Sequence, residues 1–94
     1  MNQARFTWDE KKRKLNLKKH GFDFADAEAV VRRENYVYED RRYSYSERRF
    51  ITLGFSGNTP VAITHTETSY EIRIISFRKA DRRETALLYS HIIW

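Results

Sequence analysis

The chain has 94 residues, of which 40% are hydrophobic, 15% aromatic and 33% charged, a composition that indicates one globular domain and excludes a disordered protein. The absence of cysteine excludes disulfides and thiolate nucleophiles, and the spacing of the three histidines argues against a dedicated zinc site. No apolar run approaches the roughly 18 residues of a membrane span, so we expect a cytoplasmic protein. The formal net charge of +5 favours an anionic partner, first of all nucleic acid, although a merely solvated basic surface has the same signature.

The first elements expected along the chain are a short strand and a basic helix. The strand covers residues 5–8, RFTW, and the helix begins at one of two alternative N-caps, Thr7 or Asp9. The helix runs through EKKRKLNLKKH and ends at Gly21, because glycine readily adopts the left-handed conformation that follows many helices. The positive side chains in its last turn suit the helix dipole.

A second, acidic helix is expected almost at once, with Asp23 as its cap. Phe24, Ala27 and Val31 would line one face of it, and Phe22 and Ala27 stand at the positions of a hydrophobic staple. The two segments predict a helical hairpin with one basic and one acidic member. These members would partly neutralise each other, which reduces the basic surface that the first helix can offer.

The rest of the chain predicts a sheet and a final helix. From residue 36 the hydrophobic period changes to two, and strands are expected in YVYED, RFITLGF, VAITHT and YEIRIISF, with a turn at SGNTP. Asp81 and Glu84 have the spacing of a capping box at the start of ADRRETALLYSHIIW. We therefore predict a small single α+β domain over residues 1–94, in which the N-terminal helical hairpin packs on a mainly antiparallel sheet of four to five strands and a C-terminal helix follows.

The strand at residues 70–78 carries arginines beside an apolar run. Strict alternation places Arg73, Ile75 and Phe77 on one face, and Ile72, Ile74, Ser76 and Arg78 on the other. Because an unpaired buried guanidinium is costly, Arg73 either pairs with Glu39 or Asp40 of a neighbouring strand or serves an anionic ligand. Arg78 stands at the strand end, where a side chain reaches a ligand more readily.

One face of the first helix is polar, since Lys12, Asn16, Lys19 and His20 recur at helical spacing. This face is either a polar rim over a binding surface or a packing face, with Asn16 bonded to backbone and His20 placed for the helix dipole. His65 is expected to be a satisfied histidine within the sheet. Five tyrosines either stack on nucleic-acid bases or are simply half-buried in the sheet: Tyr36, Tyr38, Tyr43, Tyr45 and Tyr70.

Three ordered segments, WDEKKRKLNLKKHGFDFADA, YSYSERRFITLGFS and RIISFRKADRRE, share a residue pattern with a known family. The matching positions are Trp8, Asp9, Lys12, Asn16, Lys19, His20, Gly21, Phe24, Ala27, Glu47, Arg49, Phe50, Gly54, Ser56, Arg73, Ile74, Ile75, Ser76, Arg78, Ala80, Glu84 and Tyr89. By these residues the chain resembles the BrnT-type toxins of bacterial type II toxin–antitoxin systems, over roughly residues 5–90. Phe77 departs from the pattern, because the family usually has alanine there, and a bulky ring at this position would reshape the neighbouring surface.

The resemblance implies a small RelE-like ribonuclease that cuts RNA and halts translation. We expect a metal-independent endoribonuclease without a cofactor, which needs an acid or base and cations for the charge that develops on phosphate. His20 is the candidate acid or base, and Arg73 and Arg78 are the candidate phosphate stabilisers. Lys12 and Lys19 would hold RNA, and a further set of cations would extend that surface: Arg49, Lys79 and Arg83.

The partners implied by the resemblance are RNA and a cognate antitoxin, with DNA contacted only indirectly through the antitoxin complex. The apolar C-terminus, residues 86–94, could form a dimer, a heterotetramer with the antitoxin, or simply the packing face of the last helix. Two other functions fit the same residues. One is an RNA-binding or ribosome-binding module without catalysis, and the other is an interaction protein whose basic surface receives an acidic antitoxin segment.

Overall fold

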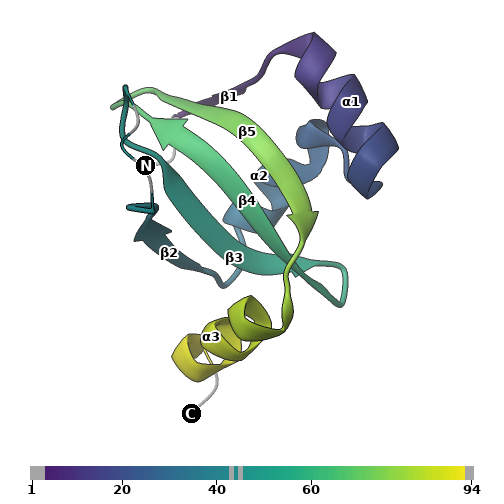
Figure 1. The fold of residues 1–94 in the computed structure, drawn as a ribbon, viewed down its shortest axis with the longest axis vertical. Helices are drawn as coiled ribbons and strands as arrows, with labels where there is room; N and C mark the ends of the chain where they lie inside the picture. The colour runs from purple at the N-terminus through teal and green to yellow at the C-terminus, as the bar shows by residue number, and fades with distance from the viewer. Residues whose placement is uncertain (1–3, 43, 45, 93–94) are drawn as a thin grey trace.

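The fold is a five-stranded sheet with helices on both faces, described here in a computed structural model over residues 4–42, 44 and 46–92 (Figure 1). Strand β1 pairs parallel with β5, and the other neighbours are antiparallel, in the order β1-β5-β4-β3-β2. The predicted α+β architecture is thereby confirmed. The elements are β1 (Arg5–Thr7), α1 (Glu10–His20), the 3₁₀ turn η1 (Phe24–Asp26), α2 (Ala27–Val31), β2 (Tyr36–Glu39), β3 (Phe50–Ser56), β4 (Thr59–Glu67), β5 (Glu71–Lys79) and α3 (Arg82–Ile92).

Two apolar clusters hold the helices to opposite faces of the sheet. On the rear face in Figure 1, η1 and α2 bury three side chains against β4 and β5. At the lower end of the front face, Leu88 of α3 packs on the second cluster. The rear cluster is Phe24, Ala27, Val30, Val61, Ile63, Ile74 and Phe77, and the front one is Ile51, Leu53, Ala62 and Leu88. No helix in the described part of the chain is long and apolar enough to cross a membrane.

Helix α1 attaches to the sheet through one polar side chain, Asn16, the only buried residue of this helix. Its carboxamide donates to the carbonyls of Phe22 and Phe77 at 3.0 and 2.8 Å and accepts from the Phe77 N–H at 3.2 Å. The packing interpretation of Asn16 is therefore confirmed. Because β1 pairs only with the first residues of β5, the backbone of Phe77 lies beyond that pairing, and this carboxamide satisfies it.

The predicted second helix is shorter and less regular than expected. Asp23 does cap it, accepting from the Ala25 N–H at 2.9 Å, but the first turn is η1 and the α-helical part is confined to α2. Val30, rather than Val31, is fully buried there. It lies against Gly54 of β3, where an added Cβ would stand 2.8 Å from a Val30 methyl, so the glycine permits this close approach.

A bulge in β5 overturns the predicted alternation of faces. Ser76 lies opposite Thr64 but Ile74 lies opposite His65, so Ile75 is an extra residue in the ladder. Ile74 and Phe77 consequently enter the same rear cluster. On the front face the bulge brings together the polar side chains of Arg73, Ser76 and Arg78.

The topology also excludes the predicted pairing of Arg73 with Glu39 or Asp40. Those carboxylates belong to the β2 edge, which β3 and β4 separate from β5 by about 14 Å at usual strand spacing. In the structure Glu39 accepts instead from Arg41 and Arg48. Arg73 is exposed, with Thr7 and Thr66 as its neighbours across the strands.

Candidate functional site

The front face of β4 and β5 is a polar surface that α3 leaves uncovered (Figure 1). Arg73 stands opposite Thr66 and Ser76 opposite Thr64, so guanidinium and hydroxyl groups alternate along neighbouring strands. Such side chains are hydrogen-bond donors suited to an extended anion. The bulge at Ile75 produces this arrangement, because it brings Ser76 back onto the same face as Arg73.

One pocket, of about 250 Å³, lies where α1 meets the edge of β5. Three predicted side chains, Lys12, Lys19 and His20, line it together, as their helical spacing indicated. Ser76 lines it from the sheet side, and it thus joins this pocket to the front face. The complete lining is Lys12, Leu15, Asn16, Lys19, His20, Ile75 and Ser76.

The remaining charges of α1 are arranged to leave that face cationic. Arg13 forms ion pairs with Glu10 and Asp23 at 2.6 and 2.7 Å, which confirms that the two members of the hairpin partly neutralise each other. Its guanidinium lowers the pKa of Asp23 to about 2, with help from the Ala25 N–H. Lys12 and Lys19 are exposed and have no ion-pair partner among the described residues.

A second pocket, of about 160 Å³, lies between β2, the end of β5 and the start of α3. It contains two predicted residues, Arg78 and Arg83. Arg78 forms a bidentate ion pair with Glu84, both distances being 2.8 Å. This contact lowers the pKa of the Glu84 carboxyl below its usual value, and the same carboxylate accepts from the Asp81 N–H at 2.9 Å.

That pair also belongs to the cap of α3. Asp81 accepts from the Glu84 N–H at 2.8 Å while Glu84 accepts from the Asp81 N–H, so the predicted capping box is present. Glu84 thereby both caps the helix and holds the Arg78 guanidinium. Arg78 is held by a bidentate contact at the end of the front face rather than displayed as a mobile cation.

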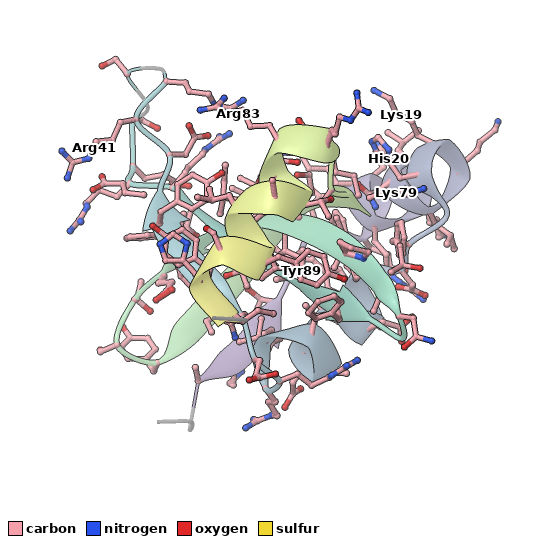
Figure 2. All side chains as sticks on the ribbon, turned by 90° about the horizontal axis from the view of Figure 1, so that it is seen from below. Lys19, His20, Arg41, Lys79, Arg83 and Tyr89 are labelled. Carbon is pink, nitrogen blue, oxygen red and sulfur yellow. The ribbon has the colours of Figure 1, made fainter. Side chains whose placement is uncertain are left out.

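Of the other predicted cations, Arg49 and Lys79 lie apart from these two pockets, whereas Arg83 lines the second one. Arg49 precedes β3 and lines an open pocket of about 420 Å³, formed largely by the segment at residues 39–49. Lys79 ends β5 and is exposed; in Figure 2 it is seen near Lys19 and His20. Arg83 lies on α3, away from α1 in the same view. The structure therefore divides the eight predicted residues among the α1 pocket, the second pocket, the front face of β5, the end of β5 and the segment before β3, instead of concentrating them at one point.

Three side chains that sequence reasoning did not assign to the site take part in it. Ser76 joins the α1 pocket to the front face, and Tyr38 and Arg42 line the second pocket. The sequence offers no basis for choosing Tyr38 among five candidate tyrosines, and no sequence pattern indicates a role for Arg42. Tyr43 and Tyr45 lie outside the described residues. His65 is buried in the sheet and its Nε2 lies 2.8 Å from the Thr52 hydroxyl, but its Nδ1 has no hydrogen-bond partner among the described residues, so the expectation of a satisfied histidine holds only in part.

The comparisons with known proteins identify the family. A family model described as "Ribonuclease toxin, BrnT, of type II toxin-antitoxin system" matches residues 8–84. The chain belongs to the BrnT family. It is also similar to the crystal structure of the Brucella abortus ribonuclease toxin BrnT, with a TM-score of 0.65, 30% sequence identity, and coverage of 84% of this chain and 99% of the other. No match is found among curated proteins.

Membership in the BrnT family makes this protein a ribonuclease toxin of a type II toxin–antitoxin system. RNA as substrate and an antitoxin as partner follow from that class. The matched residues, 8–84, contain every candidate site residue from Lys12 to Arg83. The resemblance read from the three sequence segments is thus confirmed.

Proposed function

We propose that this BrnT protein is a metal-independent endoribonuclease that cuts mRNA, and that the RNA crosses the front face of the sheet between α1 and α3. The observation that carries this proposal is the position of Ser76. It lines the α1 pocket beside Lys12 and His20 and shares the front face with Arg73. Cations from two separate elements therefore border one continuous polar surface.

The chemistry needed at this surface is limited. A base takes the proton of the 2′-hydroxyl, whose oxygen attacks phosphorus; the bond to the 5′ oxygen breaks, and that oxygen receives a proton from an acid. His20 is exposed at the pocket and serves as acid or base, which contributes about 10²–10⁴-fold. Arg73 and Arg78 stabilise the charge on phosphate, and each aimed donor contributes about 10²–10³-fold.

The lysines of α1 and the outlying cations bind RNA in this proposal without taking part in the reaction. Lys12 and Lys19 hold the RNA backbone at one side of the front face. Arg49, Lys79 and Arg83 extend the cationic surface beyond it. The cognate antitoxin neutralises the toxin by covering the same cations, and DNA is contacted only indirectly, through the antitoxin complex.

The test is RNA cleavage by the purified protein in excess EDTA, beside two folded variants. Arg73→Ala should lower the cleavage rate by about 100-fold or more, because it removes an exposed donor from the front face. Arg32→Ala is the matched control, because Arg32 pairs with Glu28 of α2, which lies behind the sheet. This variant should cleave RNA as fast as the wild type.

Three results would contradict this proposal or parts of it. Loss of wild-type cleavage in EDTA would show that a metal ion is required. Equal cleavage by Arg73→Ala and the wild type would remove Arg73 from the reaction. Salt-sensitive RNA binding without new RNA ends would favour the non-catalytic binding module instead.

A further inference from the structure

The pocket between β2, β5 and α3 is small and rich in hydrogen-bond donors. Its lining contains three guanidinium groups and the Tyr38 phenol, drawn from β2, the segment after β2, β5 and α3. At about 160 Å³ it is smaller than the 300–1,000 Å³ typical of pockets for whole organic ligands. It can therefore receive a compact group, but not a nucleobase together with its ribose. The lining residues are Tyr38, Arg42, Arg78, Asp81, Arg83, Glu84 and Leu87.

The two carboxylates of the pocket are already engaged in hydrogen bonds within the protein. Both oxygens of Glu84 accept from Arg78, and one of them accepts also from the Asp81 N–H. Asp81 accepts from the Glu84 N–H. Arg78 gives two N–H donors to Glu84 and one, at 3.3 Å, to the Lys79 carbonyl, and Arg42 gives two, both at 2.9 Å, to the buried carboxylate of Asp40. Each guanidinium has five N–H donors, so both keep donors for a ligand. With Asp40 included, the three arginines of the pocket are balanced by three acids.

Tyr38 adds a neutral donor to this set. It lies on the front side of β2, opposite Ile51, and is half-buried. Burial, and then the charge of Glu84, raise the pKa of its phenol above the usual value. The hydroxyl consequently keeps its proton at neutral pH and can donate it in a hydrogen bond to an anion.

We propose that this pocket binds a phosphate group, with the Tyr38 hydroxyl and the guanidinium groups of Arg42 and Arg78 as donors. The source of that phosphate is the backbone of the RNA substrate, and to this extent the inference rests on the proposed function. Arg78 stands on the same side of β5 as Ser76 and Arg73. RNA that follows the front face from α1 therefore brings its backbone to the mouth of the pocket.

The test uses protein labelled with ¹³C in its tyrosine rings and two probes that cannot be cleaved. Inorganic phosphate and a 2′-O-methyl RNA oligonucleotide are titrated separately, and tyrosine resonances are followed by NMR. We expect both probes to shift the Tyr38 signals. Tyr38→Phe, which keeps the ring and removes only the hydroxyl, should weaken phosphate binding roughly tenfold or more, as expected for a hydrogen bond to a charged group.

Tyr36 supplies the matched control. It lies on the same strand and the same side as Tyr38, its ring centroid is 5.7 Å from that of Tyr38, and both pack against the same apolar cluster, yet Tyr36 does not line the pocket. Tyr36→Phe should therefore bind both probes as the wild type does. Equal effects of the two substitutions, or unmoved Tyr38 signals, would overturn the inference.

The two probes distinguish this inference from the proposed nuclease activity. Binding of inorganic phosphate without binding of the oligonucleotide at Tyr38 would show an anion site that RNA does not use, and would overturn the inference. Displacement of bound phosphate by an acidic peptide, but not by the oligonucleotide, would assign the pocket to a protein partner and overturn it also. If the wild type cuts no RNA while both probes shift Tyr38, the phosphate site stands and the proposed nuclease activity fails.

Discussion

At the scale of single residues, Asn16 shows how one side chain can position a whole surface. Its three hydrogen bonds to the backbone of Phe22 and Phe77 fix α1 against β5. The same face of the helix presents Lys12 and Lys19 to the pocket beside Ser76. The polarity of Asn16 thus serves the architecture, while its neighbours on the helix face line the pocket.

Substitution of Asn16 tests that architectural role. Asn16→Ala should lower the free energy of unfolding by about 2–4 kcal/mol, because it leaves the buried N–H and carbonyl of Phe77 without their partner. Urea denaturation measures this change. Lys18→Ala, an exposed position on the same helix, should change stability by no more than about 0.5 kcal/mol. Equal stability of the two variants would contradict the role of Asn16.

At the scale of elements, one ion pair links helix α1 to the start of η1. Arg13 on α1 reaches Asp23 at the start of η1 through two hydrogen bonds of 2.7 and 3.0 Å. Asp23 also caps η1 through the Ala25 N–H. The carboxylate of Asp23 therefore both links the two members of the hairpin and caps the second of them, which begins with η1.

This pair predicts a pH dependence of stability. Arg13 lowers the pKa of Asp23 to about 2, below the usual value of 3.8, so its stabilising contribution is present above about pH 4 and is lost as the pH falls towards 2. Asp23→Asn, which keeps the capping oxygen, should lower the melting temperature at pH 7, and the difference from the wild type should vanish near pH 2. In an Arg13→Gln background the same substitution should have little effect at any pH.

The elements also show which features a sequence can reveal. Caps and turns depend on adjacent residues, and so the end of α1 at Gly21 and the capping box of Asp81 and Glu84 were predicted correctly. For the start of α1 the sequence left Thr7 and Asp9 as alternatives, and the structure selects Asp9. The bulge at Ile75 was missed, because an extra residue in a ladder depends on the partner strand and leaves no trace in the alternation of one strand. The 3₁₀ turn η1 was missed as well.

The pocket around Tyr38 lay beyond prediction for a related reason. Its side chains come from β2, β5, α3 and the segment after β2, which are far apart in the chain. Only the topology, in which β2 is the strand next to β3 and α3 returns across both, brings them together. The family resemblance could indicate the activity, but it could not indicate which tyrosine accompanies the arginines.

At the scale of the whole molecule, the chain has a net charge of +5, and Lys12 and Lys19 of α1 place part of its positive charge beside the front face. Other charges of the hairpin are neutralised by internal pairs such as that of Arg13 and Asp23. Binding of RNA to such a surface releases counterions and therefore weakens with salt. The contribution of each cation to RNA binding can be measured from the slope of log affinity against log salt concentration.

The lysines of α1 can be tested in this way. In the double variant Lys12→Ala/Lys19→Ala, the log–log slope of RNA affinity against salt should become shallower by up to about 1.4, since each phosphate contact to a single strand contributes about 0.7. The control, Lys14→Ala/Lys18→Ala, removes the same charge from the opposite side of α1. Equal slopes for the two double variants would show that net charge alone, and not the pocket face, governs RNA binding.

The contact between Asn16 and β5 has a further consequence for the rim of the sheet. Exposed strand edges invite pairing with other chains, and proteins limit this by shortening or covering them. Here the carboxamide of Asn16 occupies the N–H and the carbonyl of Phe77, on the part of β5 that β1 does not pair with. The two outer strands, β1 and β2, have only three and four residues, against seven to nine in the inner ones. The two short outer strands thus offer little edge with which a further strand could pair.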